Sequence, residues 1–129
     1  MLVRDYMTTN PRSVSSSDKA SDALKLMHDL KYSQVPVVDD GRLVGIATEG
    51  ELNSALGTIG PVTVDKVMIK DPVTIEEEAS IENAADIIRN VDFNILPVVN
   101  KDGEFTGIVS VSDILDALRE MFSFTDKPI

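Results

Sequence analysis

The chain has 129 residues, a formal net charge of −10, a sequence pI of about 4.4 and no cysteine. Without cysteine it has no disulfide, thiolate nucleophile or cysteine-ligated metal centre, and its scattered Lys and Arg residues argue against nucleic acid as a partner, because binding to phosphates requires clustered cations. Apolar runs stay below 18 residues, and the first residues lack a basic flank followed by an apolar run, so we expect no signal peptide and a cytoplasmic protein that does not span a membrane.

The first half of the chain predicts a short strand, an amphipathic helix, a β-hairpin and a closing helix. After a Met-x-x-x-Pro segment and a β-type run, apolar residues recur at the i, i+3, i+4, i+7 spacing of a helix, with Ser17 or Asp18 as the expected N-cap. Asp39-Asp40-Gly41 between two apolar runs is typical of a hairpin turn. The expected elements are the β-run 12–14, a helix over 20–30, hairpin strands 35–38 and 43–47, and a closing helix around 52–56.

The second half repeats this order. Met7 and Met68 are 61 residues apart, and beyond Lys101 one extra residue makes the offset 62. Ser80 is the expected N-cap of the helix in this half. The matching elements are the β-run 73–75, a helix over 81–91, hairpin strands 96–99 and 105–109, and a closing helix around 114–118.

The repeat predicts an α+β protein made of two β-α-β-β-α units. One copy of about 60 residues would bury only a marginal core, so we expect the two copies to pack their apolar sheet faces together about a pseudo-twofold axis. The expected boundaries are residues 1–60 for the first domain, 61–122 for the second and 123–129 for a C-terminal tail.

Each copy carries one heptad of the same pattern, GIATEGE over residues 45–51 and GIVSVSD over residues 107–113. Together with the Met-x-x-x-Pro segments, the Val-Pro-Val-Val and Leu-Pro-Val-Val runs and the Asp-Gly turns, these heptads resemble a tandem pair of cystathionine-β-synthase (CBS) domains, known as a Bateman module. The resemblance covers roughly residues 1–120. It implies a regulatory module that binds adenosine-containing ligands in clefts between the two copies, and a flat homodimer formed through helices.

The family's nucleotide motif is Gly-x-x-Thr/Ser-x-x-Asp, in which the Asp accepts hydrogen bonds from the ribose hydroxyls and the Thr or Ser hydroxyl reaches the phosphate or the ribose. The resemblance implies that each site combines the heptad of one copy with the first two strands of the other. The implied site A comprises Asn10, Pro11, Arg12, Ser13, Val14, Tyr32, Ser33, Gln34, Pro36, Ile108, Ser110 and Asp113. The implied site B comprises Ile46, Thr48, Glu51, Lys70, Asp71, Pro72, Val73, Thr74, Phe93, Asn94, Ile95 and Pro97.

Physical chemistry supports two interpretations of the heptads. A carboxylate has only acceptor positions and therefore suits a vicinal diol, which offers two donors, and the glycine would let a ligand approach the backbone. The same spacing is also that of the capping box Ser/Thr-x-x-Glu, which starts a helix. Because the capping box prefers Glu at its fourth position, Glu51 fits the box better than Asp113 does. We therefore expect Asp113 to bind ribose, whereas both interpretations stay open at Glu51.

The sequence favours AMP or ADP over ATP, with S-adenosylmethionine as a further alternative. Members of the family that hold polyphosphates often present a cation from the second strand, but the corresponding residues here are Ser33, Gln34, Asn94 and Ile95. We expect no cofactor and no metal, since the nucleotide would be a regulatory ligand. Any output would reach an unknown effector protein in trans.

We expect no enzymatic activity, because one histidine, His28, and no cysteine provide neither a conventional zinc site nor a cysteine–histidine dyad. The alternative function is a ligand-free interaction or scaffolding module in which Tyr32 or Phe93 fills the adenine position. An apolar face formed by Met121, Phe122 and Phe124 extends past the last helix, and we interpret it as a dimer contact, with packing against the other copy as the alternative.

Overall fold

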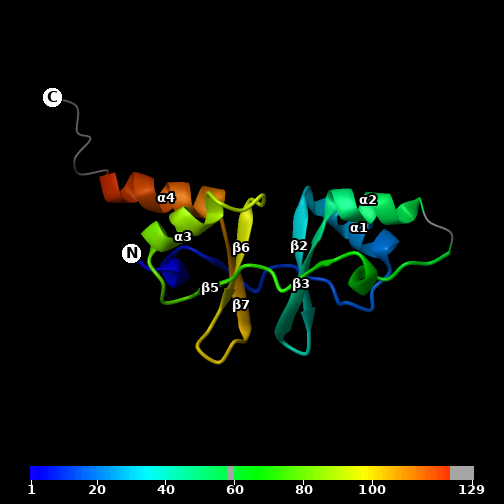
Figure 1. Ribbon diagram of the computed structural model, residues 1–129. Helices are drawn as coiled ribbons and strands as arrows, with labels where there is room; N and C mark the ends of the chain where they lie inside the picture. Colours follow the sequence, from blue (N-terminus) through cyan, green and yellow to red (C-terminus); the bar gives the residue numbers. More distant parts are fainter. Residues whose placement is uncertain (58–59, 123–129) are drawn as a thin grey trace. The chain divides into compact units, whose positions relative to one another are not determined.

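The computed structural model describes residues 1–57 and 60–122, so the tail expected over 123–129, with Phe124, lies outside the described residues. The described chain forms two compact units, each with its own sheet and helices (Figure 1). Unit 1 comprises residues 1–11, 74–102 and 106–122, and unit 2 comprises residues 12–57, 60–73 and 103–105.

The segments that precede the two repeats are exchanged between the units. The Val3 amide donates to the Ala79 carbonyl oxygen at 2.8 Å, and the Val64 amide donates to the Asp18 carbonyl oxygen at 2.9 Å. Val3 and Val64 are both fully buried, each within the core of its own unit. The first eleven residues therefore complete the unit of the second repeat, and residues 60–73 complete the unit of the first.

In unit 2, a three-stranded antiparallel sheet of order β2-β3-β4 packs with two helices that contact each other. Asp40 and Gly41 have positive φ angles of 50° and 77°, which the predicted Asp-Gly hairpin turn requires. The elements of this unit are α1 Ala20–Leu30, β2 Gln34–Asp39, β3 Arg42–Thr48, α2 Glu49–Leu56, the 3₁₀ turn η2 Val64–Lys66 and β4 Ile69–Lys70.

Unit 1 has the same components on a four-stranded sheet of order β1-β7-β6-β5. Strand β1 pairs antiparallel with β7, and β5 pairs parallel with β6. Helices α3 and α4 contact each other, and α3 also contacts β6 (Figure 1). The elements are the 3₁₀ turn η1 Val3–Asp5, β1 Thr8–Thr9, β5 Ile75–Glu76, α3 Ile81–Ile88, β6 Ile95–Val99, β7 Phe105–Ser110 and α4 Val111–Phe122.

The start of α1 differs from the expectation. Lys19 is the N-cap residue and its side chain makes no capping bond, so the assignment of Ser17 or Asp18 is wrong. The Asp18 carboxylate instead accepts from the Ser15 amide at 2.9 Å, which fixes the loop before the helix. The β-run expected over 12–14 is reduced to one bridge, in which Val14 lies parallel to Val37.

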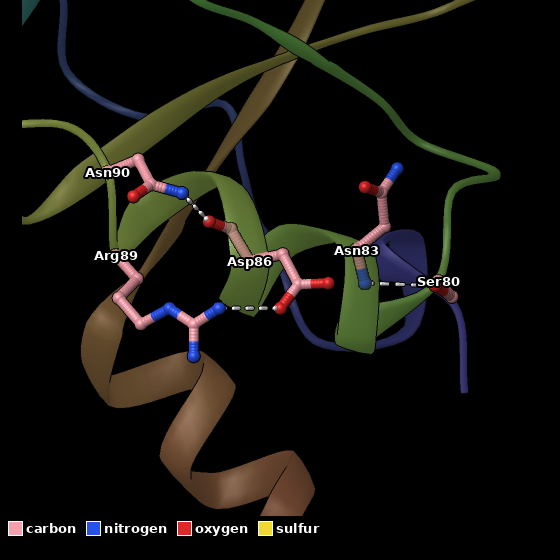
Figure 2. A network of polar contacts seen from close by, with 5 residues as sticks. All are labelled: Ser80, Asn83, Asp86, Arg89 and Asn90. Atoms are coloured by element: carbon pink, nitrogen blue, oxygen red, sulfur yellow. Dashed lines mark hydrogen bonds and ion pairs between the residues drawn. The ribbon is translucent and has the colours of Figure 1, made fainter.

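The start of α3 is confirmed, but its end comes earlier than the apolar stripe suggested. The Ser80 hydroxyl accepts from the Asn83 amide at 3.0 Å, as Figure 2 shows. At the other end, the Asn90 side-chain amide donates to the Asp86 carbonyl at 2.9 Å, and Arg89 pairs with the Asp86 carboxylate at 3.3 Å (Figure 2). The Asn90 side chain thus satisfies a carbonyl of the last turn, and the helix ends at Ile88.

Each unit has a hydrophobic core of its own. In both, the core consists of the inward stripe of the helices and the inner residues of the hairpin strands. In unit 2 these residues are Val14, Ala20, Ala23, Met27, Val35, Val37, Ala47, Leu52, Ala55 and Val64. In unit 1 they are Val3, Ile75, Ile81, Ala84, Leu96, Val98, Val109, Ile114 and Ala117.

Candidate functional site

The heptad of unit 1 forms a complete capping box at the junction between β7, which ends at Ser110, and α4, which begins at Val111. The Asp113 carboxylate accepts from the Ser110 amide through Oδ2 at 2.9 Å, and the Ser110 hydroxyl accepts from the Asp113 amide at 3.1 Å. The Val111 amide donates to the Asn94 carbonyl oxygen at 3.0 Å, which ties the start of α4 to the segment before β6. The second carboxylate oxygen, Oδ1, has no hydrogen-bond partner among the described residues.

The heptad of unit 2 forms only half of this arrangement at the start of α2. The Thr48 hydroxyl accepts from the Glu51 amide at 3.2 Å. The Glu51 carboxylate is exposed and makes no hydrogen bond or ion pair within the part of the chain that the structure describes. The Glu49 amide donates to the Ser33 carbonyl at 3.0 Å, as Val111 does to Asn94 in the other unit.

These contacts reverse the expected preference for capping. The box was expected to suit Glu51 better than Asp113, yet Asp113 closes the box and Glu51 leaves it open. The Asp113 carboxylate is therefore a helix cap in this structure, and its remaining acceptor capacity is what could serve a diol.

The heptad glycines accommodate the close approach of the chain's own backbone. A Cβ atom at Gly107 would lie 2.5 Å from the Thr8 carbonyl oxygen and 3.3 Å from the Met7 sulfur. At Gly45 it would lie 2.8 Å from both the Ile69 carbonyl oxygen and the Met68 sulfur. The close approach of β1 and β4, which pair with the heptad strands, is therefore sufficient to require glycine at both positions.

The residues of each predicted site are divided between the two units. Unit 1 holds Asn10, Pro11, Ile108, Ser110 and Asp113 of site A with Thr74, Phe93, Asn94, Ile95 and Pro97 of site B. Unit 2 holds Arg12, Ser13, Val14, Tyr32, Ser33, Gln34 and Pro36 of site A with Ile46, Thr48, Glu51, Lys70, Asp71, Pro72 and Val73 of site B. For each predicted site, the structure therefore describes the residues in unit 1 and the residues in unit 2 separately.

Within the units, the short strands bring part of the predicted sets together. Ile108 is the pairing partner of Thr8 and Gly107 that of Thr9, so in this antiparallel pair Asn10 follows at the Gly107 end of the heptad, away from Asp113. Lys70 pairs with Gly45 in the same way in unit 2. Asn10 and Asp71 both have a φ of 51°, a left-handed conformation that Asn and Asp adopt more readily than most residues.

Burial separates supporting side chains from those that could contact a ligand. Pro36 and Ile46 are fully buried and pack within the fold. Tyr32 and Val73 have 39% and 51% of their surface exposed, so they are the apolar predicted residues open to a base. Lys70 and Arg12 are exposed cations.

A surface hollow of about 400 Å³ on unit 2 was missed by the sequence analysis. It lies over α1 and α2, and its lining includes no residue of the predicted sites. The lining residues are Ser21, Leu24, Lys25, His28, Glu49 and Asn53. The only sequence signal was the polar i, i+4, i+7 spacing of Ser21, Lys25 and His28 on the first helix, which also describes an ordinary solvated face.

Two groups outside the predicted sites, Asp39 and Tyr6, have shifted pKa values. The hydroxyl and amide of Ser16 lower the pKa of Asp39, which caps the loop before α1. The hydrogen bond from the Tyr6 hydroxyl to Glu120 at 2.6 Å raises the pKa of Tyr6 to about 12. Both are structural contacts that join neighbouring segments of one unit.

Within residues 1–57 and 60–122, no helix combines the length and apolar character needed to cross a bilayer. The same residues contain no group of three or more His, Cys, Asp or Glu side chains suited to a metal ion.

The model of the CBS domain family matches residues 3–58 and 64–120 of the chain. The protein therefore belongs to the CBS domain family, and it carries two copies of that domain. The α+β class and the repeated architecture expected from the sequence are confirmed by this match and by the solved relatives.

Solved structures of CBS-pair proteins resemble the chain over nearly its full length. CBSX2 from Arabidopsis thaliana is 27% identical with a TM-score of 0.86, covering 95% of this chain and 96% of that one. CBSX2 in complex with AMP is 29% identical with a TM-score of 0.83, covering 93% and 97%. The CBS domain pair of protein MJ0100, in complex with 5′-methylthioadenosine and S-adenosyl-L-methionine, is 25% identical with a TM-score of 0.79, covering 94% and 98%.

Curated relatives include both long and short proteins. An inosine-5′-monophosphate dehydrogenase of Korarchaeum cryptofilum (strain OPF8) is 30% identical over 126 residues, which are 98% of this chain and 25% of that enzyme. The chain thus spans about a quarter of the length of this relative. A CBS domain-containing protein of Dictyostelium discoideum is 31% identical over 134 residues, covering 92% of this chain and 91% of that protein.

Proposed function

We propose that this protein is a cytoplasmic regulatory module that binds an adenosine-containing ligand through the ribose and is not itself an enzyme. The observation that carries the proposal is the carboxylate of Asp113, which the capping box holds at the end of β7 with one oxygen unpaired among the described residues. An ionised carboxylate accepts strong hydrogen bonds from a diol, each contributing about 1.5–3 kcal/mol. The AMP complex of CBSX2, a relative of similar length and fold, supports adenosine as the ligand class.

Among adenosine ligands, we propose AMP or ADP ahead of ATP. The described residues expected to face the phosphates from the second strands are Ser33, Gln34, Asn94 and Ile95, and none is a cation. With a net charge of −10, the protein repels a triphosphate more strongly than a monophosphate. S-adenosylmethionine is the alternative within this class, because the MJ0100 domain pair was solved with it and with 5′-methylthioadenosine.

Ligand binding can be tested by the thermal unfolding of the purified chain. A ligand at one hundred times its dissociation constant stabilises the folded state by about 2.7 kcal/mol, so AMP or ADP should raise the melting temperature at lower concentration than ATP. The matched control is 2′,3′-dideoxyadenosine monophosphate, which lacks both ribose hydroxyls and should give little shift. Equal shifts with the dideoxy compound would contradict recognition through the diol, and a stronger effect of ATP would contradict the ligand order.

The second candidate function is a ligand-free interaction module. The observation that favours it is the capping role of Asp113, since a carboxylate that starts a helix has a structural reason to be present. This candidate predicts no thermal shift with any adenosine compound.

We further propose that the module acts as a homodimer through its helices and reports ligand binding to an effector protein in trans. Support comes from an apolar stripe on α4, where the exposed side chains of Val111, Leu115 and Phe122 follow helical spacing and Leu115 and Phe122 are more than half exposed. Ligand would act by stabilising one of two arrangements of the module, which requires different affinities for the two.

A further inference from the structure

Both repeats carry a methionine at the same point, next to a short strand that pairs with a heptad strand. Met7 directly precedes β1, which pairs with β7, and Met68 directly precedes β4, which pairs with β3. We propose that Met7 and Met68 are modification sites, at which a peroxide oxidises the thioether to a sulfoxide and thereby loosens the short strand in each unit. This modification is independent of any nucleotide and goes beyond the proposed function.

Each of the two sulfur atoms lies against the glycine of a heptad. A Cβ atom placed on Gly45 would lie 2.8 Å from the Met68 sulfur and 3.1 Å from the Met68 Cγ atom. A Cβ atom placed on Gly107 would lie 3.3 Å from the Met7 sulfur. Both methionines also pack against the hydrophobic core of their own unit, so each thioether fills the space between a core and a heptad strand.

The two side chains differ from a core methionine in their exposure. Met7 and Met68 are half-buried, so part of each side chain is open to water and to a small oxidant such as hydrogen peroxide. Met27, within the core of unit 2, is fully buried. We therefore expect peroxide to oxidise Met7 and Met68 in the folded protein while Met27 stays a thioether.

The oxidation needs no reagent besides the peroxide. A lone pair of the methionine sulfur attacks one oxygen of hydrogen peroxide, and the O–O bond breaks. The transferred hydroxyl group passes its proton to the departing hydroxide, which leaves as water. The sulfur is oxidised by two electrons and the peroxide is reduced by two, and the product is a polar and chiral sulfoxide.

A sulfoxide is incompatible with the contact that the thioether makes. An oxygen directed at Gly45 would enter space that is already too small for a methyl group, and burying it without a donor costs free energy. An oxygen directed at water would draw the side chain away from the core. Because β1 and β4 each pair with their neighbour over only two residues, few hydrogen bonds resist this displacement. The closer contact of Met68 predicts the larger effect in unit 2.

The test combines peptide mass spectrometry with thermal unfolding of the full chain before and after treatment with hydrogen peroxide. Sulfoxide should form at Met7 and Met68 but not at Met27, and the melting temperature should fall by about 3–6 °C. Reduction by methionine sulfoxide reductases specific for the two epimers should restore it. The double variant Met7→Leu, Met68→Leu, which conserves side-chain volume, should keep its melting temperature in peroxide although Met1 is still oxidised. Met121→Leu, at a half-buried position that packs against neither core, is the control and should remain as sensitive as the unaltered chain.

Glutamine variants separate the effect of polarity from other damage by peroxide. Met68→Gln places an unbranched polar side chain of similar length against Gly45 and should lower the melting temperature without any oxidant, whereas Met121→Gln should not. The proposal is overturned if the double leucine variant loses as much thermal stability in peroxide as the unaltered chain. It is equally overturned if Met7 and Met68 resist oxidation, or if their sulfoxides leave the melting temperature unchanged. Failure of the chain to bind adenosine compounds would contradict the proposed function alone, since none of these measurements contains a nucleotide.

Discussion

Gly107 lies against the backbone of a neighbouring short strand, and this contact predicts the effect of adding a single methyl group. In Gly107→Ala the new Cβ would lie 2.5 Å from the Thr8 carbonyl oxygen, so β1 or β7 must move. Overpacking of this kind costs about 1–3 kcal/mol. We expect a lower free energy of unfolding, measured by urea denaturation.

Gly50→Ala is the matched control for this substitution. Gly50 lies within α2, and nothing comes within 4 Å of a Cβ atom placed there. Because alanine is the better helix former, this variant should be more stable by about 0.5–1 kcal/mol. A loss of stability at Gly50 as large as that at Gly107 would show that backbone contact is not the cause.

The residue types in the heptads could be read from the sequence, but their partners could not. The Ser-x-x-Asp spacing gave both the capping and the ribose interpretation, and the box at Asp113 became evident only from its two bonds with Ser110. The role of Gly107 depends on Thr8, which is 99 residues away in the chain and adjacent only through β1–β7 pairing. No local pattern contains that information.

At the scale of elements, the end of β2 is joined to the loop before α1 by one carboxylate. Asp39 accepts from the Ser16 amide at 3.0 Å and from the hydroxyls of Ser15 and Ser16. These bonds, chiefly those of Ser16, lower the pKa of Asp39 in the folded state. A carboxyl whose pKa is lower in the folded than in the unfolded chain stabilises the fold above its unfolded pKa.

This linkage predicts an acid-sensitive contribution to stability. At neutral pH, Asp39→Asn should melt below the unaltered protein because it loses charge-assisted bonds. The difference should shrink as the pH falls below 3.8, the ordinary value, and through the lowered folded pKa, where Asp39 itself becomes neutral. Thermal unfolding followed by circular dichroism at several pH values measures this difference.

Asp40→Asn is the control, because it removes the same charge from the neighbouring residue. Asp40 is exposed, has a left-handed φ of 50° that Asn also tolerates, and makes no hydrogen bond among the described residues. The melting temperature of the Asp40→Asn variant should follow that of the unaltered protein across the pH range. An Asp39→Asn difference that stays constant down to low pH would contradict the linkage.

Sequence periodicity located all four helices and both hairpins of the described chain, since these depend on local spacing and turn chemistry. It failed at the start of α1, where a loop bonded to Asp39 places the N-cap at Lys19 instead of Ser17 or Asp18. The first amide of the helix, that of Ala20, donates to the Val62 carbonyl oxygen at 2.8 Å, a contact that a local motif does not record.

At the scale of the whole molecule, the exchange of leading segments could not be foreseen. Val3 and Val64 occupy matching positions in the two repeats and are chemically identical, so each would suit the core of either unit. The structure places Val3 with the second repeat and Val64 with the first. The choice is made by contacts between distant residues, such as the hydrogen bond from the Val3 amide to the Ala79 carbonyl oxygen, which no local pattern records.

The proposed regulation requires the protein to form a homodimer. If the stripe on α4 forms the homodimer, the chain should sediment with twice the 14.0 kDa mass of one copy. Leu115→Glu places a charge on this stripe, where Leu115 is 53% exposed and contributes little to the core of unit 1. We expect this variant to sediment as a monomer in analytical ultracentrifugation while keeping its circular dichroism spectrum, because burying an unpaired carboxylate at an interface is strongly unfavourable.

Asp116→Asn, next to Leu115 on α4, is the control and should stay dimeric. A Leu115→Glu protein that remains dimeric would place the interface on another surface, with the α1–α2 face of unit 2 as the next candidate for the same charge substitution.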